Sequence, residues 1–352
     1  MKDDSNGLEA INSRQSEQGN ADMKTDLPTR PLGKTGLDIT RVGIGAWAMG
    51  GNMWGPQDDA ESDAAIRHAI ELGINWIDTA AVYGNGHSEE VIGQTLRKLP
   101  ADRRPLVFTK GGIVRDSEGK NPRRIGERNH LRGGLENSLK RLGVETIDLY
   151  QMHWPSDDVG LEEYWSALLE LKAEGKVRHV GLSNHSVEQL AKAEAIGHVE
   201  TLQPPFSMIK RQTAAEILPW CHAHGTGVIC YSPMQAGLLT GTFTAERAAA
   251  LADNDWRRES PEFQGDALVA NLALADSLKP IAQKHGTSVS SVALAWVLSW
   301  PGLTAAIVGA RSPAQVDGWI DAARLELDAD DLETIAQSIE RTGAGSGPSR
   351  PA

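Results

Sequence analysis

The chain has 352 residues, of which 40% are hydrophobic and 23% are charged, and its formal net charge at pH 7 is −12. These values are typical of a globular protein with a sizeable core, and the acidic balance excludes a broad basic surface for nucleic acid or an anionic membrane. No apolar run approaches the ~18–20 residues needed to span a bilayer, so no membrane partner is expected.

Both ends of the chain are predicted to lie outside the folded part. The polar segment 1–26 is expected to be a disordered N-terminal tail, with Met23 as an alternative start, and 341–352 a flexible C-terminal tail. The N-terminus lacks the basic-then-apolar layout of a secretory signal, so a cytoplasmic location is expected. Cys221 and Cys230 form no C-x-x-C pair, which argues against a disulfide framework or a structural zinc site.

Between the tails, residues 27–340 repeat one sequence pattern: a β-rich run, a polar or glycine break, and then a helical stretch. The predicted strands are 39–47, 75–80, 105–111, 147–153, 177–184, 201–206, 227–233 and 304–310. The predicted helices are 58–73, 88–99, 128–143, 161–175, 186–197, 213–225, 288–300 and 312–323. Eight such units predict a single (β/α)8 TIM barrel, since a doubly wound sheet more often has five to seven strands.

The segment 234–287 separates the seventh and eighth predicted strands and is a long insertion, with a helical pattern over 265–286. In a barrel of this kind, such an insertion lies at the C-terminal face of the strands. Because active sites form at that face, the insertion is expected to border the functional site.

The first predicted strand contains a glycine pattern that resembles a dinucleotide-binding turn. Gly43, Gly45 and Ala48 fit G-x-G-x-x-G/A. The pattern has this meaning only where a helix opens directly after it. Here three glycines and a proline follow Ala48 before any helix could start, so a Rossmann turn is excluded.

Four residues that could carry chemistry fall at the ends of neighbouring strands. Asp78, Lys110 and His153 end the second, third and fourth predicted strands, and Tyr83 follows Asp78 in the next loop. Each has an ordinary structural explanation alone, but in a barrel their shared end brings them together. A nearby lysine is expected to lower the pKa of the tyrosine, while the aspartate holds the lysine. The tyrosine can then act as a general acid and base, the imidazole can orient a carbonyl oxygen, and a nicotinamide would supply a hydride.

Several motifs together resemble the aldo-keto reductase superfamily, most like the bacterial branch around the inositol-operon aldo/keto reductases. The resemblance extends from about Arg30 to Leu327 and rests on these motifs, in the family's order: "IDTAAVYGNGHSEEVIG", "FTKGG", "IDLYQMHWP", "GKVRHVGLSN", "LQPPFS", "YSPMQAGLLTG" and "AIVGARSPAQV". The resemblance implies that Asp78, Tyr83, Lys110 and His153 form the catalytic tetrad, with Tyr83 as the proton donor.

The same resemblance implies NADP(H), bound across the barrel mouth without a Rossmann turn. It places Ser183, Asn184 and Gln203 at the nicotinamide carboxamide and Tyr231 against the ring. The residues implied along the pyrophosphate are Ser232, Met234, Gly237 and Leu239. Those implied at the adenosine end are Gly309, Arg311, Ser312 and Gln315.

The charge of Arg311 independently favours a 2′-phosphate, because a guanidinium can bind a phosphate with two hydrogen bonds. Gly318 and Trp319 depart from the family, since many members carry Glu-Asn at these positions. This departure weakens the predicted grip on adenine and the preference for NADPH over NADH.

Substrate walls are predicted at Trp47, Trp54 and Trp154, which follow strand ends. The predicted function is therefore an NADPH-dependent reductase of aldehydes and ketones that works reversibly, with a small-molecule carbonyl substrate as its partner. An alternative is an NADP(H)-binding regulatory module that senses redox state and turns over slowly. The sequence predicts neither the physiological substrate nor the oligomeric state.

A third class, a metal-dependent barrel hydrolase, would require bound zinc. The histidines of "HAH" at 222–224 lie at the end of a predicted helix, where histidine is favoured by the helix dipole. We therefore expect no metal.

Overall fold

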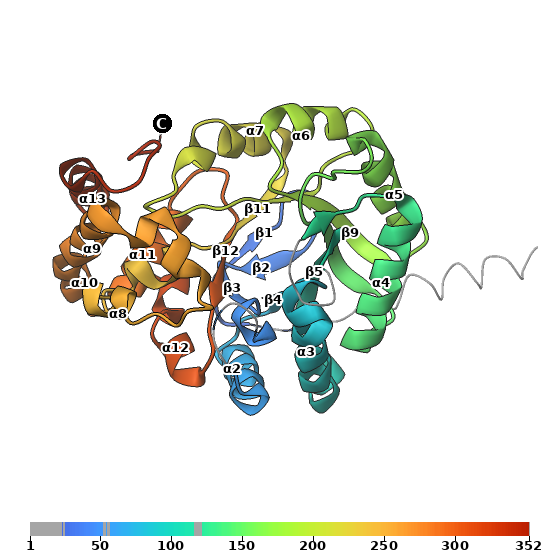
Figure 1. Ribbon diagram of the computed structural model, residues 1–352, viewed down its shortest axis with the longest axis horizontal. Coiled ribbons are helices and arrows are strands. Elements are labelled where there is room, and N and C mark those ends of the chain that lie inside the picture. Colours follow the sequence, from blue (N-terminus) through green and yellow to red (C-terminus); the bar gives the residue numbers. More distant parts are fainter. Residues whose placement is uncertain (1–22, 24, 52–53, 55–56, 116–121, 352) are drawn as a thin grey trace, which may run out of the picture.

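A computed structural model of the chain describes residues 23, 25–51, 54, 57–115 and 122–351. Its centre is a closed barrel of eight parallel strands, which confirms the predicted fold (Figure 1). In order around the barrel, the strands are β3 (Val42–Gly45), β4 (Trp76–Asp78), β5 (Leu106–Gly111), β8 (Ile147–Met152), β9 (Val177–Ser183), β10 (Thr201–Gln203), β11 (Gly227–Cys230) and β12 (Ala305–Gly309). Apart from the exposed Gly309 and half-buried residues in β9, these strands are buried, as expected of a parallel sheet covered by helices.

The helices that follow the strands form a ring around the barrel (Figure 1). They are α2 (Asp59–Glu71), α3 (His87–Lys98), α4 (Arg128–Leu142), α5 (Leu161–Ala173), α6 (Val187–Glu194), α7 (Ile217–His224), α11 (Val289–Leu298) and α12 (Pro313–Asp317), and α13 (Ala329–Thr342) ends the series. Local sequence sets their ends: Ser186 and Gln189 form a capping box at the start of α6, and Gly143 ends α4 with φ of 70°.

Two predicted helices are shorter in the structure because their sequences contain a break. The predicted stretch 265–286 divides into α9 (Gly265–Ser277) and α10 (Lys279–Lys284), since Pro280 has no N–H for the helical ladder. The stretch 312–323 divides at Gly318 into α12 and the 3-10 turn η8 (Ile320–Ala323).

The N-terminal end of the barrel is closed by a hairpin that was not predicted, and the end of its second strand falls within the predicted first strand 39–47. The hairpin consists of β1 (Thr29–Pro31) and β2 (Asp38–Thr40), which pair antiparallel. Ile39 of β2 and Leu32 and Leu37 of the hairpin loop belong to the same buried cluster as Trp76, whose indole Nε1 donates to the Thr40 carbonyl at 2.9 Å. A Cβ on Gly43 would lie 2.1 Å from the Trp76 ring, so close packing explains this glycine.

After β3 comes the 3-10 turn η1 (Ala48–Gly50), and α2 begins only at Asp59, which confirms that the glycine pattern is no Rossmann turn.

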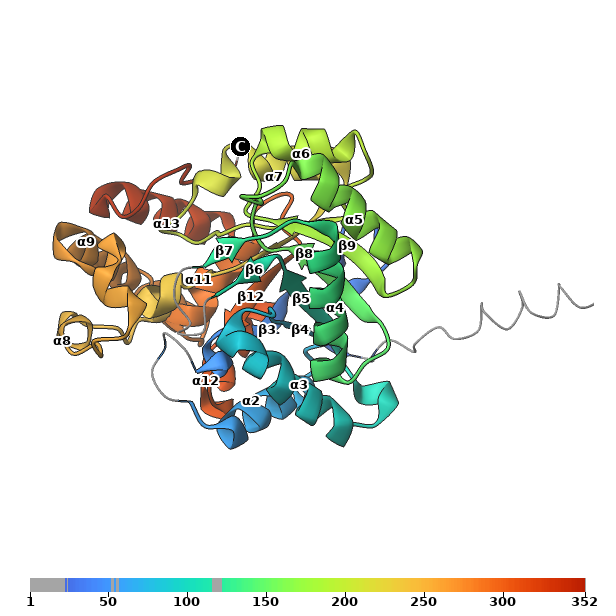
Figure 2. The ribbon, with the colours of Figure 1, turned by 45° about the vertical axis from the view of Figure 1, so that its right-hand side comes forward.

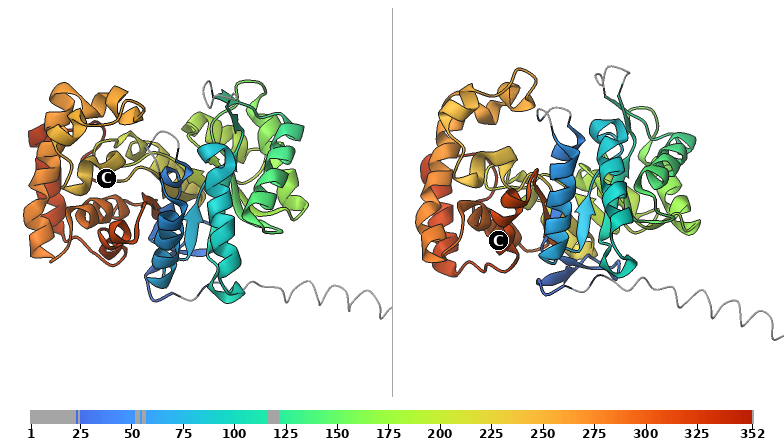
Figure 3. Two further views of the ribbon diagram at one scale, coloured as in Figure 1. Left: turned by 60° about the horizontal axis from the view of Figure 1, so that its bottom comes forward. Right: turned by 90° about the horizontal axis from the view of Figure 1, so that it is seen from below.

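The insertion between β11 and β12 lies along one side of the barrel and carries α8 (Ala245–Ala249), α9 and α10 (Figures 2 and 3). A second small hairpin, β6 (Ile113–Val114) with β7 (Arg123–Arg124), follows β5 (Figure 2). In the part of the chain that the structure describes, no helix has the length and hydrophobicity needed to cross a membrane.

The residues after α13 are held against the barrel, which differs from the flexible tail expected over 341–352. The Arg211 backbone N–H donates to Ser346 at 2.9 Å, and the Ser346 N–H donates to Ile209 at 3.1 Å. Gly345 has φ of 62°, and a Cβ there would lie 1.9 Å from the Ile209 carbonyl, so only glycine lets the backbones approach. Most of the predicted N-terminal tail lies outside the described residues.

Candidate active site

A cavity of about 1220 Å³ opens at the C-terminal ends of the barrel strands. Most of the predicted site residues line it: Trp47, Trp54, Asp78, Tyr83, His153, Trp154, Ser183, Asn184, Gln203, Tyr231, Ser232, Met234, Gly237, Gly309, Arg311 and Gln315. Three lie elsewhere. Lys110 is buried beneath the cavity floor, Leu239 is fully buried in the core, and Ser312 precedes α12 outside the lining.

Asp78 and Lys110 form a buried ion pair in the floor of this cavity. Lys110 Nζ donates to Asp78 Oδ1 at 2.7 Å and to the Thr79 carbonyl at 2.8 Å. Gln203 Nε2 donates to the other carboxylate oxygen at 2.8 Å. Burial raises the pKa of Asp78 and lowers the pKa of Lys110, while the attraction between the two charges opposes both shifts. Each charged group therefore stabilises the ionised form of its partner, which burial alone would disfavour.

Tyr83 begins the tight turn η2 (Tyr83–Gly86) after β4, and its ring lies beside the ion pair. Lys110 Nζ is 5.4 Å from the ring centroid. The pKa of Tyr83 is raised well above 10 by burial, and further by Asp78 and Tyr231. This contradicts the predicted lowering of the pKa, because burial outweighs the attraction of a lysine whose charge Asp78 already matches. The phenol is therefore protonated at neutral pH and can donate a proton.

His153 follows β8, and its ring meets the Tyr83 ring edge-on with centroids 5.7 Å apart. Burial, followed by the charges of Lys110 and Arg115, holds the pKa of His153 well below 6.5. A neutral imidazole has one N–H donor and one acceptor nitrogen. The ring can therefore orient an oxygen next to the phenol without carrying a charge.

Polar groups at the ends of β9, β10 and β11 form the next part of the cavity wall. Asn184 adopts a left-handed backbone conformation, with φ of 64°, and its side-chain amide donates to the His153 carbonyl at 3.0 Å. The Tyr231 hydroxyl donates to Asn184 Oδ1 at 2.8 Å, and Ser183 Oγ donates to the Gln203 carbonyl at 2.8 Å. These bonds fix the amide and the phenol ring in place at the cavity surface.

The turn after β11 stores backbone strain beside the cavity. Ser232 and Ala236 have φ of 55° and 51°, and both line the cavity. Non-glycine residues in this region cost of order 1–3 kcal/mol and cluster at ligand clamps and active sites. The strain makes this wall a candidate binding surface.

Arg311 joins the two sides of the far end of the cavity. Its guanidinium donates to the Trp54 carbonyl at 3.1 Å and to the side-chain carbonyl of Gln57, and Gln57 donates back to the Arg311 carbonyl at 3.2 Å. The backbone N–H of Arg311 donates to Gln315 Oε1 at 2.8 Å. The arginine thus connects the segment after β3 with the start of α12. Trp319, which departs from the family pattern, is buried and also lines the cavity.

A group of aromatic side chains lies next to Tyr83. Trp47 stacks on Tyr83 with centroids 6.1 Å apart and on Trp256 at 5.8 Å, while Trp54 meets Trp47 edge-on at 5.1 Å. Trp256 comes from the insertion and packs against Trp47 and Trp54 without itself lining the cavity. The sequence did not predict this contact, although Trp256 belongs to the segment expected to border the site. The third predicted wall residue, Trp154, lies under the Arg124 guanidinium at 4.7 Å.

A buried pair of residues that no sequence motif indicated, His185 and Tyr164, supports the Asn184 segment. His185 Nδ1 lies 2.8 Å from the Ser183 carbonyl, which can only accept, so Nδ1 carries the proton. Nε2 therefore accepts from the Tyr164 hydroxyl at 2.8 Å. Burial lowers the pKa of His185 to about 4, against an opposing effect of the Ser183 hydrogen bond.

This histidine makes the fold sensitive to acid. The unfolded chain binds a proton at His185 near pH 6.5 but the folded chain only near pH 4, so stability is lost as the pH falls through this window. Linkage predicts that His185 lowers the free energy of unfolding by about 2 kcal/mol between pH 7.5 and pH 5. Urea denaturation at both pH values should show this drop in the wild type and a correspondingly smaller one in His185→Gln. Equal drops in the two proteins would contradict the assignment.

Among the described residues, no three His, Cys, Asp or Glu side chains gather so as to hold a metal ion. The "HAH" histidines lie at the end of α7, where His224 stacks on Trp220 with ring centroids 3.9 Å apart. Its Nδ1 donates to the Trp220 carbonyl at 2.8 Å. The contacts of His224 are therefore those of a helix end.

Comparison with known proteins gives consistent matches over most of the chain. The sequence model of the aldo/keto reductase family matches residues 41–340. The chain is 34% identical over 312 residues to the aldo-keto reductase YhdN of Bacillus subtilis, which covers 88% of this chain and 93% of that protein. It is 33% identical over 332 residues to the NADH-specific methylglyoxal reductase of Escherichia coli, covering 88% and 99%. The structure of the glycerol dehydrogenase AKR11B4 from Gluconobacter oxydans superposes with a TM-score of 0.81 at 34% identity, covering 93% of this chain and 98% of that chain.

Proposed function

The chain belongs to the aldo/keto reductase family, and from this premise we propose that it is an NADPH-dependent reductase of aldehydes and ketones in which Tyr83 is the general acid and base. Members of this family are oxidoreductases that use nicotinamide cofactors. The observation that carries the proposal is the position of Tyr83 between the Asp78–Lys110 pair and the neutral His153, at one end of a cavity of about 1220 Å³.

The residues of this cavity fit an extended nicotinamide dinucleotide. The cavity is lined from Asp78 and Tyr83 through Asn184 and Tyr231 as far as Gln315. The strained turn after β11 and the polar side chains of Ser183, Asn184 and Gln203 provide a clamp along that path. When bound, the cofactor would supply the hydride for the carbonyl carbon.

Residues of the chain itself hold the proton and transfer it to the substrate oxygen. His153 donates a hydrogen bond from its neutral imidazole to the substrate oxygen and holds it beside the phenol. The raised pKa of Tyr83 keeps its proton in place until charge develops on that oxygen, and the O–H bond then breaks as the new O–H bond forms. Lys110, 5.4 Å from the ring centroid, stabilises the phenolate left behind, and Asp78 fixes the lysine. In the reverse direction the phenolate takes the alcohol proton.

Arg311 supports the preference for NADPH, because a 2′-phosphate at this position would meet a fixed guanidinium. The NADH-specific relative makes this preference a point to be tested directly. We expect Arg311→Ala to raise the Kd of NADPH by about 10–100-fold, as expected for a lost charge-assisted hydrogen bond, and the Kd of NADH far less.

The matched control is Gln57→Ala, which releases the segment that Arg311 tethers but keeps the guanidinium. It should change the affinities for both cofactors by similar small factors. Fluorescence titration with each cofactor measures the four constants. A parallel loss for NADPH and NADH in Arg311→Ala would show that Arg311 acts by holding the loop and not by binding a phosphate.

Trp47 and Trp54, which line the cavity and pack against Trp256, favour substrates whose carbon skeleton packs against indole rings. The names of the relatives add methylglyoxal and glyceraldehyde, the aldehyde related to glycerol, to the panel. Initial rates of NADPH oxidation should be measured with these, with short and aromatic aldehydes and with sugars, and repeated with NADH. Saturable turnover of at least one carbonyl is expected. Tight cofactor binding without any turnover would instead favour the redox-sensing module.

A further inference from the structure

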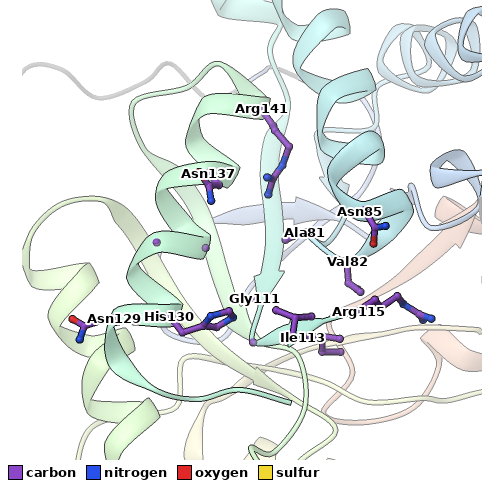
Figure 4. Close-up of a pocket in the computed structure, with 14 residues that line it drawn as sticks. Ala81, Val82, Asn85, Gly111, Ile113, Arg115, Asn129, His130, Asn137 and Arg141 are labelled. Atoms are coloured by element: carbon purple, nitrogen blue, oxygen red, sulfur yellow. The ribbon is translucent and has the colours of Figure 1, made fainter. Parts of the chain in front are cut away.

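A second cavity, of about 480 Å³, lies beside the barrel mouth between the turn after β4, the end of β5 and helix α4. Figure 4 shows Asn137, Arg141 and His130 extending toward it from α4, with Asn85 on the opposite side. Val82, Ile113 and Arg115 line both cavities and separate them. Nothing in the proposed reduction uses this second space.

Two adjacent glycines keep this cavity open. Gly133 and Gly134 lie in the interior of α4, where glycine is less stable than alanine because it loses more backbone entropy. A Cβ on Gly133 would meet nothing within 4 Å, and one on Gly134 would make only an ordinary contact of 3.7 Å with the Tyr150 hydroxyl. Packing therefore does not require either glycine, and side chains at these positions would fill the cavity.

The lining is rich in hydrogen-bond donors. It includes Arg115, Arg141, His130 and three asparagines, and no carboxylate among the lining residues that the structure describes. This runs against the composition of the whole chain, which has 47 acidic and 35 basic residues. Behind the lining, the buried Glu89 accepts from Arg141 at 2.6 Å and holds that guanidinium in place.

A buried hydroxyl group lies under the same surface. Tyr150 is fully buried, and its hydroxyl has no hydrogen-bond partner among the described residues. The hydroxyl lies against two glycines of the lining, since a Cβ on Gly111 would be 1.9 Å from it and one on Gly134 3.7 Å. A buried O–H without an acceptor is costly, and an acceptor atom that reached it between Gly111 and Gly134 would satisfy it.

We propose that this cavity is a second binding site, separate from that of the carbonyl substrate and cofactor, for a small anion with the chemistry of a carboxylate or a phosphate monoester. Guanidinium, imidazole and amide donors select an acceptor-rich, negatively charged ligand, because the lining that the structure describes contains no carboxylate and Glu89, which pairs with Arg141, lies behind it. The site contacts the segments that carry the candidate catalytic residues. The Gly111 carbonyl accepts from the His153 N–H at 3.1 Å, and the Ala81 N–H donates to the Lys110 carbonyl at 3.1 Å.

Isothermal titration calorimetry of the full chain with inorganic phosphate, and separately with malonate, tests the site and distinguishes the two anion chemistries. Each titration is run without cofactor and with saturating NADP⁺. Saturable binding of at least one anion that persists with NADP⁺ is expected. Absence of binding by both anions would overturn the proposal. Loss of binding on addition of NADP⁺ would also overturn it, because the anion would then occupy the barrel-mouth cavity.

Two variants with matched controls place the anion in the second cavity. Gly133→Leu fills the space and Asn137→Asp adds a negative charge, and each should weaken binding by about tenfold or more. Gly133→Ala leaves most of the space and Asn137→Gln stays neutral, so both should bind much as the wild type does. Melting temperatures confirm that all four proteins are folded. Unchanged affinity in both Gly133→Leu and Asn137→Asp would overturn the assignment.

Discussion

We expect Tyr83→Phe to lower kcat by about 10²–10⁴-fold, the range typical of a lost general acid, and to leave the affinity for the cofactor unchanged. The phenylalanine ring fills the same place against Trp47 and His153, so the cavity wall keeps its shape. Only the proton donor is lost. Steady-state rates of NADPH oxidation with the best carbonyl of the panel measure the effect.

The control for this variant is cofactor binding, followed by fluorescence titration, together with the melting temperature. Both should stay near the values of the wild type, because the Tyr83 hydroxyl makes no hydrogen bond within the part of the chain that the structure describes. A variant that keeps most of its activity would show that another group supplies the proton. A variant that loses cofactor affinity in parallel with kcat would show that Tyr83 serves binding.

The second large effect is expected for Lys110→Met, which should lower both the free energy of unfolding and the turnover rate. Removing the lysine leaves the buried Asp78 carboxylate without its cation, and breaking a buried pair from one side costs about 3–5 kcal/mol. Turnover should also fall steeply, because the phenolate of Tyr83 loses its nearest positive charge. Urea denaturation and rates of NADPH oxidation on the same protein separate the two losses.

The double variant Asp78→Asn/Lys110→Met separates the structural role of the pair from its chemical role. It removes the buried charge from both sides and should recover part of the lost stability, since a neutral replacement of a buried pair is often tolerated. Activity should stay as low as in Lys110→Met. Recovery of turnover together with stability would mean that the pair only maintains the fold.

Much of the barrel could be predicted because its signals are local. Each strand is a short β-rich run set off from the next helix by a polar or glycine break, and several helices have a local cap or stop, such as Ser186 or Gly143. The strand-end positions of Asp78, Lys110 and His153 follow from the same local signals. In the structure, Asp78 and His153 line the cavity and Lys110 bonds to Asp78 beneath it.

The features that could not be predicted depend on contacts between distant segments. Position 43 requires glycine because the Trp76 ring of the next strand lies against it. The C-terminal residues are held by backbone hydrogen bonds to the segment around Ile209 and Arg211. The pKa of Tyr83 was predicted in the wrong direction because the sequence shows that a lysine is near but not how deeply the phenol is buried. The stacking of Trp256 on Trp47 likewise arises from the course of a long insertion.

A single-turnover experiment tests the central claim most directly. NADPH-loaded wild type and Tyr83→Phe are mixed with the same carbonyl, and cofactor oxidation and alcohol formation are followed together. The proposed mechanism predicts one alcohol per bound cofactor in the wild type, and a rate about 10²–10⁴-fold lower in Tyr83→Phe at equal cofactor occupancy. Equal rates in the two proteins, or oxidation of NADPH without formation of the alcohol, would contradict it.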